Sequence, residues 1–226
     1  MIEVSHLSGA ANPGIAHEMV KTSRATRAEA ALERLADEAA GCQDCDLYRN
    51  ATQTVFGQGA ANARIMLLGE QPGDHEDKAG EPFVGPAGRI LDKALDEVGL
   101  CRDDVYVTNA VKHFKWTAKG KRRIHQRPTA REAAACHQWL EGELAAVDPA
   151  VIVLLGATAG QTIFGSKFRV GAARGEVLDL DGRAVVATIH PSAVLRVREP
   201  ADRDEQYAGL VTDLRRAVEV SKEENR

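Results

Sequence analysis

The chain has 226 residues, 44% of them hydrophobic and 27% charged, with a formal net charge of -4 at pH 7. This length and composition favour one large α/β domain with a sizeable core. The sequence has no run of about 18 apolar residues and no apolar segment behind a basic start. We therefore expect neither a membrane span nor a secretion signal, and a cytoplasmic location. The negative charge argues against indiscriminate polyanion binding, although it leaves room for a local basic surface.

The predicted organisation is a flexible N-terminal arm over residues 1–26, a single domain over 27–220 and a frayed C-terminus over 221–226. Helical patterns that begin or end at proline, glycine or capping signals predict the helices. They span residues 27–40, 86–98, 129–147, 157–164 and 203–220.

Four short apolar runs alternate with these helices and predict the strands, at 64–68, 105–108, 151–155 and 185–189. Near-continuous apolar strands separated by helices indicate a three-layer α/β/α fold with a central four-stranded, mostly parallel sheet. In such sheets ligands bind beyond the carboxyl ends of the strands. The polar residues that follow the runs should therefore meet at one edge; they are Glu70, Gln71, Asn109 and His190.

A basic segment follows the second predicted strand. No acidic residue lies between Asp104 and Glu132, and aromatic Phe114 and Trp116 are interleaved with its cations. The cations are Lys112, Lys115, Lys119, Lys121, Arg122, Arg123, Arg127 and Arg131. Clustered cations with aromatic side chains suit phosphates and exposed bases, so the segment predicts a nucleic-acid surface, the alternative being a solvated basic loop.

The four cysteines predict a metal or cluster site. Cys42 and Cys45 form a C-x-x-C beside a helix end, which favours ligation over a redox pair because the motif does not open a helix within a βαβ unit. The spacing does not distinguish zinc from iron and sulfur. His113 is a candidate fourth ligand, since an imidazole nitrogen can replace a thiolate. Cys101 and Cys136 can equally be small buried hydrophobes.

Several motifs in chain order resemble those of the iron-sulfur uracil-DNA glycosylases of bacteria and archaea. They are GEQPG at 69–73, PFVGPAG at 82–88, YVTNAVK at 106–112 and HPS at 190–192. The likeness covers about residues 42–217. It implies the uracil-DNA glycosylase fold and an enzyme of the N-glycosyl hydrolase class that takes uracil-containing DNA, single strands included, and releases free uracil. A monomer is expected.

Two departures from that family are similar to its UdgX branch, whose members bond covalently to uracil-containing DNA. His113 stands where the family has its usual third cluster cysteine, and KRRIH at 121–125 is an added loop. The resemblance implies a four-iron four-sulfur cluster, with Cys101 a bystander. Its ligands would be Cys42, Cys45, His113 and Cys136. A competing set replaces His113 with Cys101.

Within this resemblance, four residues would bind the flipped uracil. Asn109 offers a donor to O4 and an acceptor to N3–H, Phe83 a stacking face, and Gln71 further contacts. His190 would donate to O2, where charge collects as the base leaves. The plainer interpretations are core packing for Phe83, turn capping for Asn109 and a local hydrogen bond for His190.

The remaining roles concern the sugar and the backbone. Glu70 would stabilise the sugar cation and orient its attacker. His125 would attack C1' and form a dead-end conjugate, so that turnover stops after one cycle, with Arg123 holding its loop. The residues expected to contact DNA are Pro72, Gly73, Lys121, Arg122, Arg123 and Ser192.

Two alternatives stay open. One is a conventional multiple-turnover glycosylase in which water attacks the sugar and the added loop only grips DNA. The other is a non-catalytic iron-sulfur module associated with DNA, in which the residues at the sheet edge are ordinary turn residues. Uracil release would distinguish a glycosylase from the non-catalytic module. A conjugate that survives denaturation would distinguish self-capture from a multiple-turnover glycosylase.

Overall fold

A computed structural model describes residues 13–223 of the chain. Within them, a six-stranded sheet has the order β1-β3-β2-β6-β8-β7. Its four central strands are parallel and are the predicted ones: β2 (Ile65–Gly69), β3 (Val105–Asn109), β6 (Val151–Leu155) and β8 (Arg183–Thr188). The sheet is wider than the predicted four strands, because β1 (Gln58–Gly59) and β7 (Val177–Leu180) add antiparallel edges.

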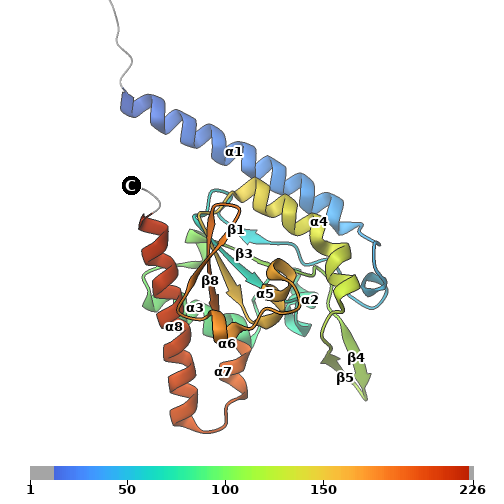
Figure 1. Ribbon diagram of the computed structural model, residues 1–226. Coiled ribbons are helices and arrows are strands. Elements are labelled where there is room, and N and C mark those ends of the chain that lie inside the picture. The colour runs from blue at the N-terminus through green and yellow to red at the C-terminus, as the bar shows by residue number, and fades with distance from the viewer. Residues whose placement is uncertain (1–12, 224–226) are drawn as a thin grey trace, which may run out of the picture.

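Helices cover both faces of this sheet, as predicted (Figure 1). One face packs against α3 (Pro86–Glu97) and α8 (Pro200–Glu223). The other packs against α4 (Ala130–Val147), α5 (Ala157–Phe164) and α6 (Val170–Ala173). Three of the four central strands, β2, β3 and β6, are buried at every position, which explains why they show apolar runs instead of alternation.

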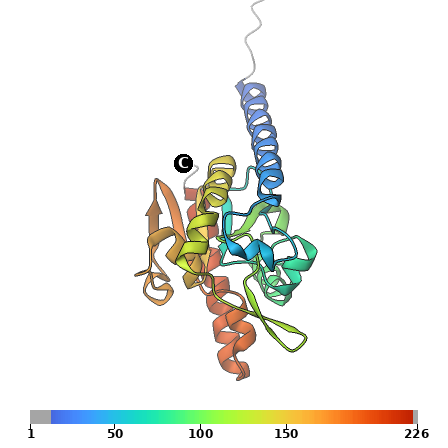
Figure 2. The same cartoon turned by 90° about the vertical axis from the view of Figure 1, so that its right-hand side faces the viewer.

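The first helix, α1 (Pro13–Ala40), is longer than predicted. Pro13 stands at its first position, where the missing N–H costs no hydrogen bond, and the helix continues without a break to Ala40, just before Gly41. The predicted arm is therefore helical from Pro13, while residues 1–12 lie outside the described part of the chain. The outer half of α1 extends away from the sheet, whereas its end packs beside α4 (Figures 1 and 2).

The C-terminal helix also runs further than predicted. α8 continues to Glu223, and Ser221 is buried with its hydroxyl donating to the Val218 carbonyl at 2.8 Å. Residues 221–223 are thus part of the helix rather than frayed, and residues 224–226 are not described. No helix in the described residues is long and apolar enough to cross a membrane.

The basic segment is a hairpin rather than a loop. β4 (Trp116–Lys119) and β5 (Arg122–His125) pair with each other and project beyond the sheet (Figure 1). Two short helices complete the same edge, α2 (Asp74–Ala79) after β2 and α7 (Ser192–Arg196) after β8. The hairpin tip turns at Gly120, whose φ of 59° suits glycine.

Candidate active site

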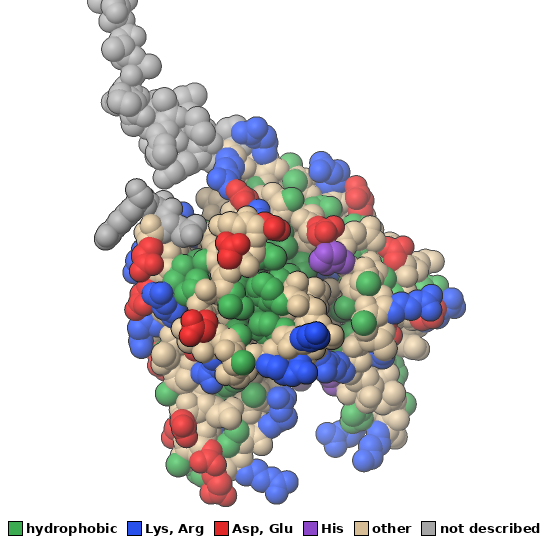
Figure 3. Space-filling view, in the orientation of Figure 1, with side chains coloured by type: hydrophobic (Ala, Val, Ile, Leu, Met, Phe, Trp, Pro, Cys, Tyr) green, Lys and Arg blue, Asp and Glu red, His purple; other side chains and the backbone are tan. Residues whose placement is uncertain are grey.

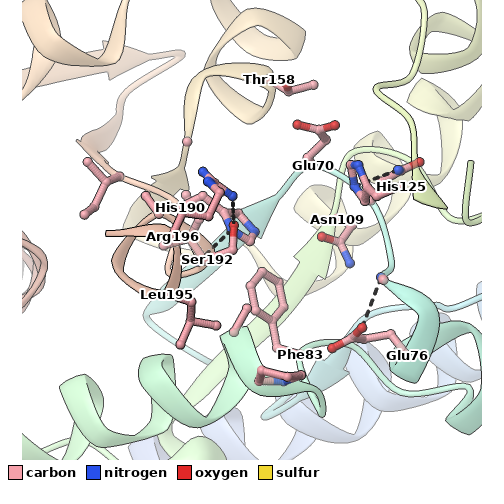
Figure 4. A pocket seen from close by; sticks show the side chains of 18 of the residues that line it. Glu70, Glu76, Phe83, Asn109, His125, Thr158, His190, Ser192, Leu195 and Arg196 are labelled. Carbon is pink, nitrogen blue, oxygen red and sulfur yellow. Dashed lines mark hydrogen bonds between the residues drawn. The ribbon is translucent and has the colours of Figure 1, made fainter. Parts of the chain in front are cut away.

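A pocket of about 650 Å³ lies at the carboxyl ends of the parallel strands. Figure 4 shows Glu70, Phe83, Asn109, His125 and His190 around the same space. Asn109 ends β3, Glu70 and His190 follow β2 and β8, Phe83 lies between α2 and α3, and His125 ends β5 of the hairpin. The meeting of Glu70, Asn109 and His190 depends on parallel strands that present their ends at one edge. The predicted convergence is confirmed.

Asn109 and Phe83 form one wall of the pocket. Asn109 is 2% exposed, and its Oδ1 is buried without a hydrogen-bond partner. A Cβ on Gly69 would collide with both side chains, so only glycine at the end of β2 permits this wall. Phe83 is held in a left-handed conformation with φ of 56°, and Arg102 Nη2 donates to its carbonyl at 3.0 Å. An unsatisfied buried amide and a strained aromatic residue are typical of a ligand site.

His190 presents one ring nitrogen to the pocket. Its Nδ1 accepts from the Ser192 N–H at 3.2 Å and lies 2.8 Å from Ser192 Oγ, which in turn accepts from Arg196 Nη1 at 2.8 Å. Burial lowers the pKa of His190 to about 4, with the positive charge of Arg196 and then His125 adding to the effect. The ring is therefore neutral at pH 7 with its proton on Nε2, a donor directed at the pocket.

This arrangement gives Ser192 a role within the protein. Its hydroxyl and its N–H contact His190 and Arg196 and so orient the imidazole, while its predicted contact with a DNA phosphate stays a prediction. Arg196 belongs to the site as well, since it lines the pocket and donates to Ser192.

Glu70 and His125 face each other across one side of the pocket (Figure 4). Glu70 Oε1 is buried and has no hydrogen-bond partner. Burial lowers the pKa of His125, while the charge of Glu70 raises it and that of Arg196 lowers it. A carboxylate with a free oxygen beside a neutral imidazole can stabilise a cation between them, or take a proton from the ring.

Gln71 anchors the base of the hairpin. Its Oε1 accepts from the Lys115 N–H at 2.9 Å, and its Nε2 donates to the Gln126 carbonyl at 2.8 Å and lies 2.8 Å from His125 Nε2. Both ends of the side-chain amide thus have partners within the protein, and Gln71 lines the pocket. Its contact with uracil, expected partly through its backbone, stays a prediction.

Arg123 binds the hairpin to α2. Its guanidinium pairs with Asp74 and, at 2.6 Å, with Asp77, which is fully buried, and lies about 5.5 Å from the rings of Phe114 and Trp116. Arg123 thus holds the loop as predicted, but it is only 16% exposed and its charge is matched by two carboxylates, so it is not a free phosphate contact. In the sequence, the only indication of these ion pairs is that two acidic residues, Asp74 and Asp77, lie in the first turn of α2.

Gly73 also has a structural role. Glu76, buried and not singled out from the sequence, accepts from the Gly73 N–H at 3.1 Å and from the Gly85 N–H at 2.7 Å, which joins two loops of the pocket. Pro72 is buried beside Gly73 and has no N–H to offer, and the DNA contacts expected of both residues stay predictions.

Five exposed cations lie on two projections. Lys119, Lys121 and Arg122 are exposed on the hairpin, and Arg196 and Arg198 on and just after α7. Lys112, expected on the same basic surface, is buried instead. Figure 3 shows basic side chains on both projections, with a hollow between them. This placement agrees with the predicted basic surface and brings it to the edge that holds the pocket.

Three of the cysteines gather where α1 ends. Cys42, Cys45 and Cys136 belong to one apolar cluster with Trp139, whose Nε1 donates to Cys42 Sγ at 3.3 Å. Burial raises the pKa of the Cys136 thiol to about 11, with the other two thiols adding to it. Nearby, His113 is 3% exposed and its Nδ1 is buried without a partner, while its Nε2 lies 3.0 Å from Thr54 Oγ1.

These residues fit a cluster better than a single ion. Among the described residues, no three His, Cys, Asp or Glu side chains are close enough to hold one metal ion. A cluster of several irons spaces its ligands more widely, and three thiols with an unsatisfied imidazole are a suitable donor set. Cys101 is exposed and precedes β3, whereas His113 follows the other end of that strand. This placement argues against Cys101 as the alternative ligand.

The fold and the pocket define an α/β protein with polar side chains gathered at its strand ends, and comparison with known proteins gives its family. The chain belongs to the uracil DNA glycosylase superfamily, whose model matches residues 56–215. It is similar to a type-4 uracil-DNA glycosylase of Thermotoga maritima, with 37% identity over 198 residues that cover 87% of this chain and 97% of that protein.

Two further relatives come from archaea. A type-4 uracil-DNA glycosylase of Archaeoglobus fulgidus is 36% identical over 189 residues, which cover 79% of this chain and 92% of that protein. A type-5 uracil-DNA glycosylase of Pyrobaculum aerophilum is 38% identical over 151 residues, which cover 59% of this chain and 63% of that protein.

Proposed function

We propose that the protein is a uracil-DNA glycosylase that excises uracil and then captures the abasic sugar on His125, so that each molecule acts once. The observation that carries this proposal is the unpartnered Glu70 carboxylate facing the neutral His125 ring at the pocket. The substrate is uracil-containing DNA, single strands included, free uracil is the product, and the protein acts as a monomer.

Uracil is read by Asn109 and held by Phe83. The Asn109 side-chain amide offers a donor for uracil O4 and an acceptor for N3–H, and its Oδ1 has no partner within the protein. Phe83 offers a buried ring for stacking, and its centroid lies 5.7 Å from that of His190. Cytosine has the opposite pattern on that edge, so it would leave the amide unsatisfied.

Excision breaks the bond between C1' and N1 of uracil. Both electrons leave with the base, and His190 Nε2–H donates to uracil O2, where the negative charge collects. The sugar is left as an oxocarbenium-like cation, which the Glu70 carboxylate stabilises from the opposite side. Lys121 and Arg122, exposed on the hairpin, hold the DNA backbone.

Capture forms a bond between an imidazole nitrogen of His125 and C1'. The ring supplies the electron pair, and the proton of its other nitrogen passes to Glu70 or to water, which leaves a neutral N-substituted imidazole. Arg123, paired with Asp74 and Asp77, keeps the hairpin and its histidine at the pocket. The bond between the imidazole and C1' in this product is not readily hydrolysed.

We further propose that Cys42, Cys45, His113 and Cys136 hold a four-iron four-sulfur cluster. Its task would be structural, since it would join the end of α1 to α4 and to the segment after β3. The support is the shared apolar cluster of the three thiols and the unsatisfied Nδ1 of His113.

A conventional multiple-turnover glycosylase is the second candidate, favoured by the names of the type-4 relatives. Denaturing electrophoresis after mixing the protein with a uracil-containing single strand distinguishes the two. Self-capture gives a shifted band in a one-to-one yield, and mass spectrometry places the sugar on His125. Free abasic DNA from a catalytic amount of protein would exclude self-capture, and the absence of uracil release would exclude both.

A further inference from the structure

A buried ion pair lies directly behind the base-reading wall of the pocket. Lys112 Nζ donates to Glu143 Oε2 at 2.5 Å, and the two side chains are 1% and 0% exposed. A buried pair of this kind gains little stability over well-packed apolar residues, because both charges lose their hydration. The feature to explain is therefore its position, next to the residue that forms the base-reading wall.

Glu143, on α4, is fully satisfied by the strand. Its Oε1 accepts from the Gly57 N–H at 3.0 Å and from Tyr106 Oη at 3.1 Å, and its carboxylate accepts from Thr108 Oγ1 at 2.9 Å. The carboxylate is therefore fixed relative to β3, and it fixes the ammonium group of Lys112 in turn.

Lys112 connects this fixed carboxylate to the pocket. Its Nζ also donates to the Asn109 carbonyl at 2.8 Å and to Thr108 Oγ1 at 2.7 Å. The Lys112 side chain thus turns back toward the end of β3. Its hydrogen bond to the Asn109 carbonyl holds the peptide group between Asn109 and Ala110 in place. The Lys112 backbone is held as well, since its carbonyl accepts from the Val55 N–H at 2.8 Å.

We infer that Lys112, held by Glu143, is a positioning residue that aims the Asn109 amide at uracil. Asn109 Oδ1 has no protein partner to orient it, so the direction of the side chain depends on its backbone and on packing. The Lys112 ammonium group holds the backbone of Asn109 through the hydrogen bond to its carbonyl. This inference rests on the proposed function, because it concerns how the same pocket reads its base.

The test is a double-mutant cycle on uracil excision, measured as a single-turnover rate with protein in excess over a uracil-containing single strand. Lys112→Met/Glu143→Gln removes both charges while glutamine keeps an acceptor for Gly57 and Tyr106. We expect this variant to fold and to excise uracil about tenfold more slowly, the effect of one misplaced hydrogen bond. In an Asn109→Ala background the same change should slow excision less than about twofold, since the residue it acts through is gone.

Arg174 and Asp213 provide a matched control. Arg174 Nε pairs with Asp213 at 2.7 Å, and Asp213 accepts from the buried Thr188 Oγ1 at 2.6 Å, but no hydrogen bond links this pair to Asn109 in the described structure. Any slowing caused by Arg174→Met/Asp213→Asn should add in full to that of Asn109→Ala.

An unchanged excision rate in Lys112→Met/Glu143→Gln would overturn the inference, and so would full additivity of its effect with that of Asn109→Ala. The proposed function would still stand as long as the wild-type protein excises uracil. A wild-type protein that releases no uracil would overturn both. If the double variant does not fold, Lys112→Arg, which keeps the charge but moves the donors, is measured in the same cycle. An effect that is absent or fully additive there overturns the inference, and a non-additive one supports it.

Discussion

The Gln71 amide and the His125 ring lie 2.8 Å apart, Nε2 to Nε2, and this contact fixes the protonation of the histidine. The Lys115 N–H and the Gln126 carbonyl set which end of the amide is nitrogen. Gln71 Nε2 must therefore donate, and His125 Nε2 must accept, so the ring is neutral with its proton on Nδ1. Attack through Nε2 therefore requires the contact with Gln71 to open, after which the Nδ1 proton can pass to Glu70 or to water.

Changing Gln71→Glu should reverse this contact. A carboxylate can only accept, so it would favour a proton on His125 Nε2 and would repel the Gln126 carbonyl. We expect covalent capture to slow by about tenfold, the effect of one lost hydrogen bond, while uracil release persists. Quenched time courses that score free uracil and conjugate separately test this, and equal slowing of both steps would show that Gln71 acts on excision.

Excision and capture should separate at His125. His125→Ser leaves room for water, so the variant should still release uracil, within about tenfold of the wild-type rate, while its denaturant-stable conjugate disappears. Glu70→Gln, in contrast, should slow both steps because the sugar cation loses its carboxylate. A conjugate that forms at the native rate in His125→Ser, or one trapped only by reduction and mapped to Lys121, would assign the nucleophile elsewhere.

The Asn109→Asp variant tests base recognition. An ionised aspartate presents an acceptor where uracil O4 needs a donor, a mismatch that costs about 1–3 kcal/mol in a dry pocket. Uracil excision should slow accordingly, and activity on cytosine should rise relative to it. Paired uracil- and cytosine-containing strands give the ratio, and a ratio equal to that of the wild type would mean that another group reads the base.

Cluster binding should depend on three cysteines and not on the fourth. Protein purified without oxygen should be brown and contain iron, and replacing Cys42, Cys45 or Cys136 with alanine should remove the colour and lower solubility, because the segments lose their crosslink. Cys101→Ala is the matched control and should keep both, since Cys101 is exposed at η2 (Arg102–Asp104). A colourless zinc protein would refute the assignment.

His190 should make stability depend on pH in a defined window. Its pKa is about 4 when folded, below the ordinary value of 6.5, so between these values the unfolded chain binds more protons. Its contribution to stability is complete above about pH 6.5 and is lost as the pH falls toward 4. Chemical denaturation at several pH values should show a weaker pH dependence for His190→Gln, and an unchanged slope would mean that the ring is protonated in the folded state.

Much of this protein was predictable from local patterns. Fully apolar runs mark the four central strands because a parallel sheet covered on both faces leaves no position for water. The same order of strands and helices places Glu70, Asn109 and His190 at one edge, since the ends of parallel strands share a direction. The edge strands were missed because β1 has two residues and β7 alternates in exposure, which gives little apolar signal.

What the tertiary structure decided is which partner each polar side chain takes. Sequence indicated Arg123 as a DNA contact and Gln71 as a uracil contact, but both bind groups that lie more than 40 positions away along the chain. The Lys112–Glu143 pair joins residues 31 positions apart and has no local signature. Residue type fixes what a side chain can donate or accept, whereas only packing determines which groups lie within hydrogen-bonding distance once water is excluded.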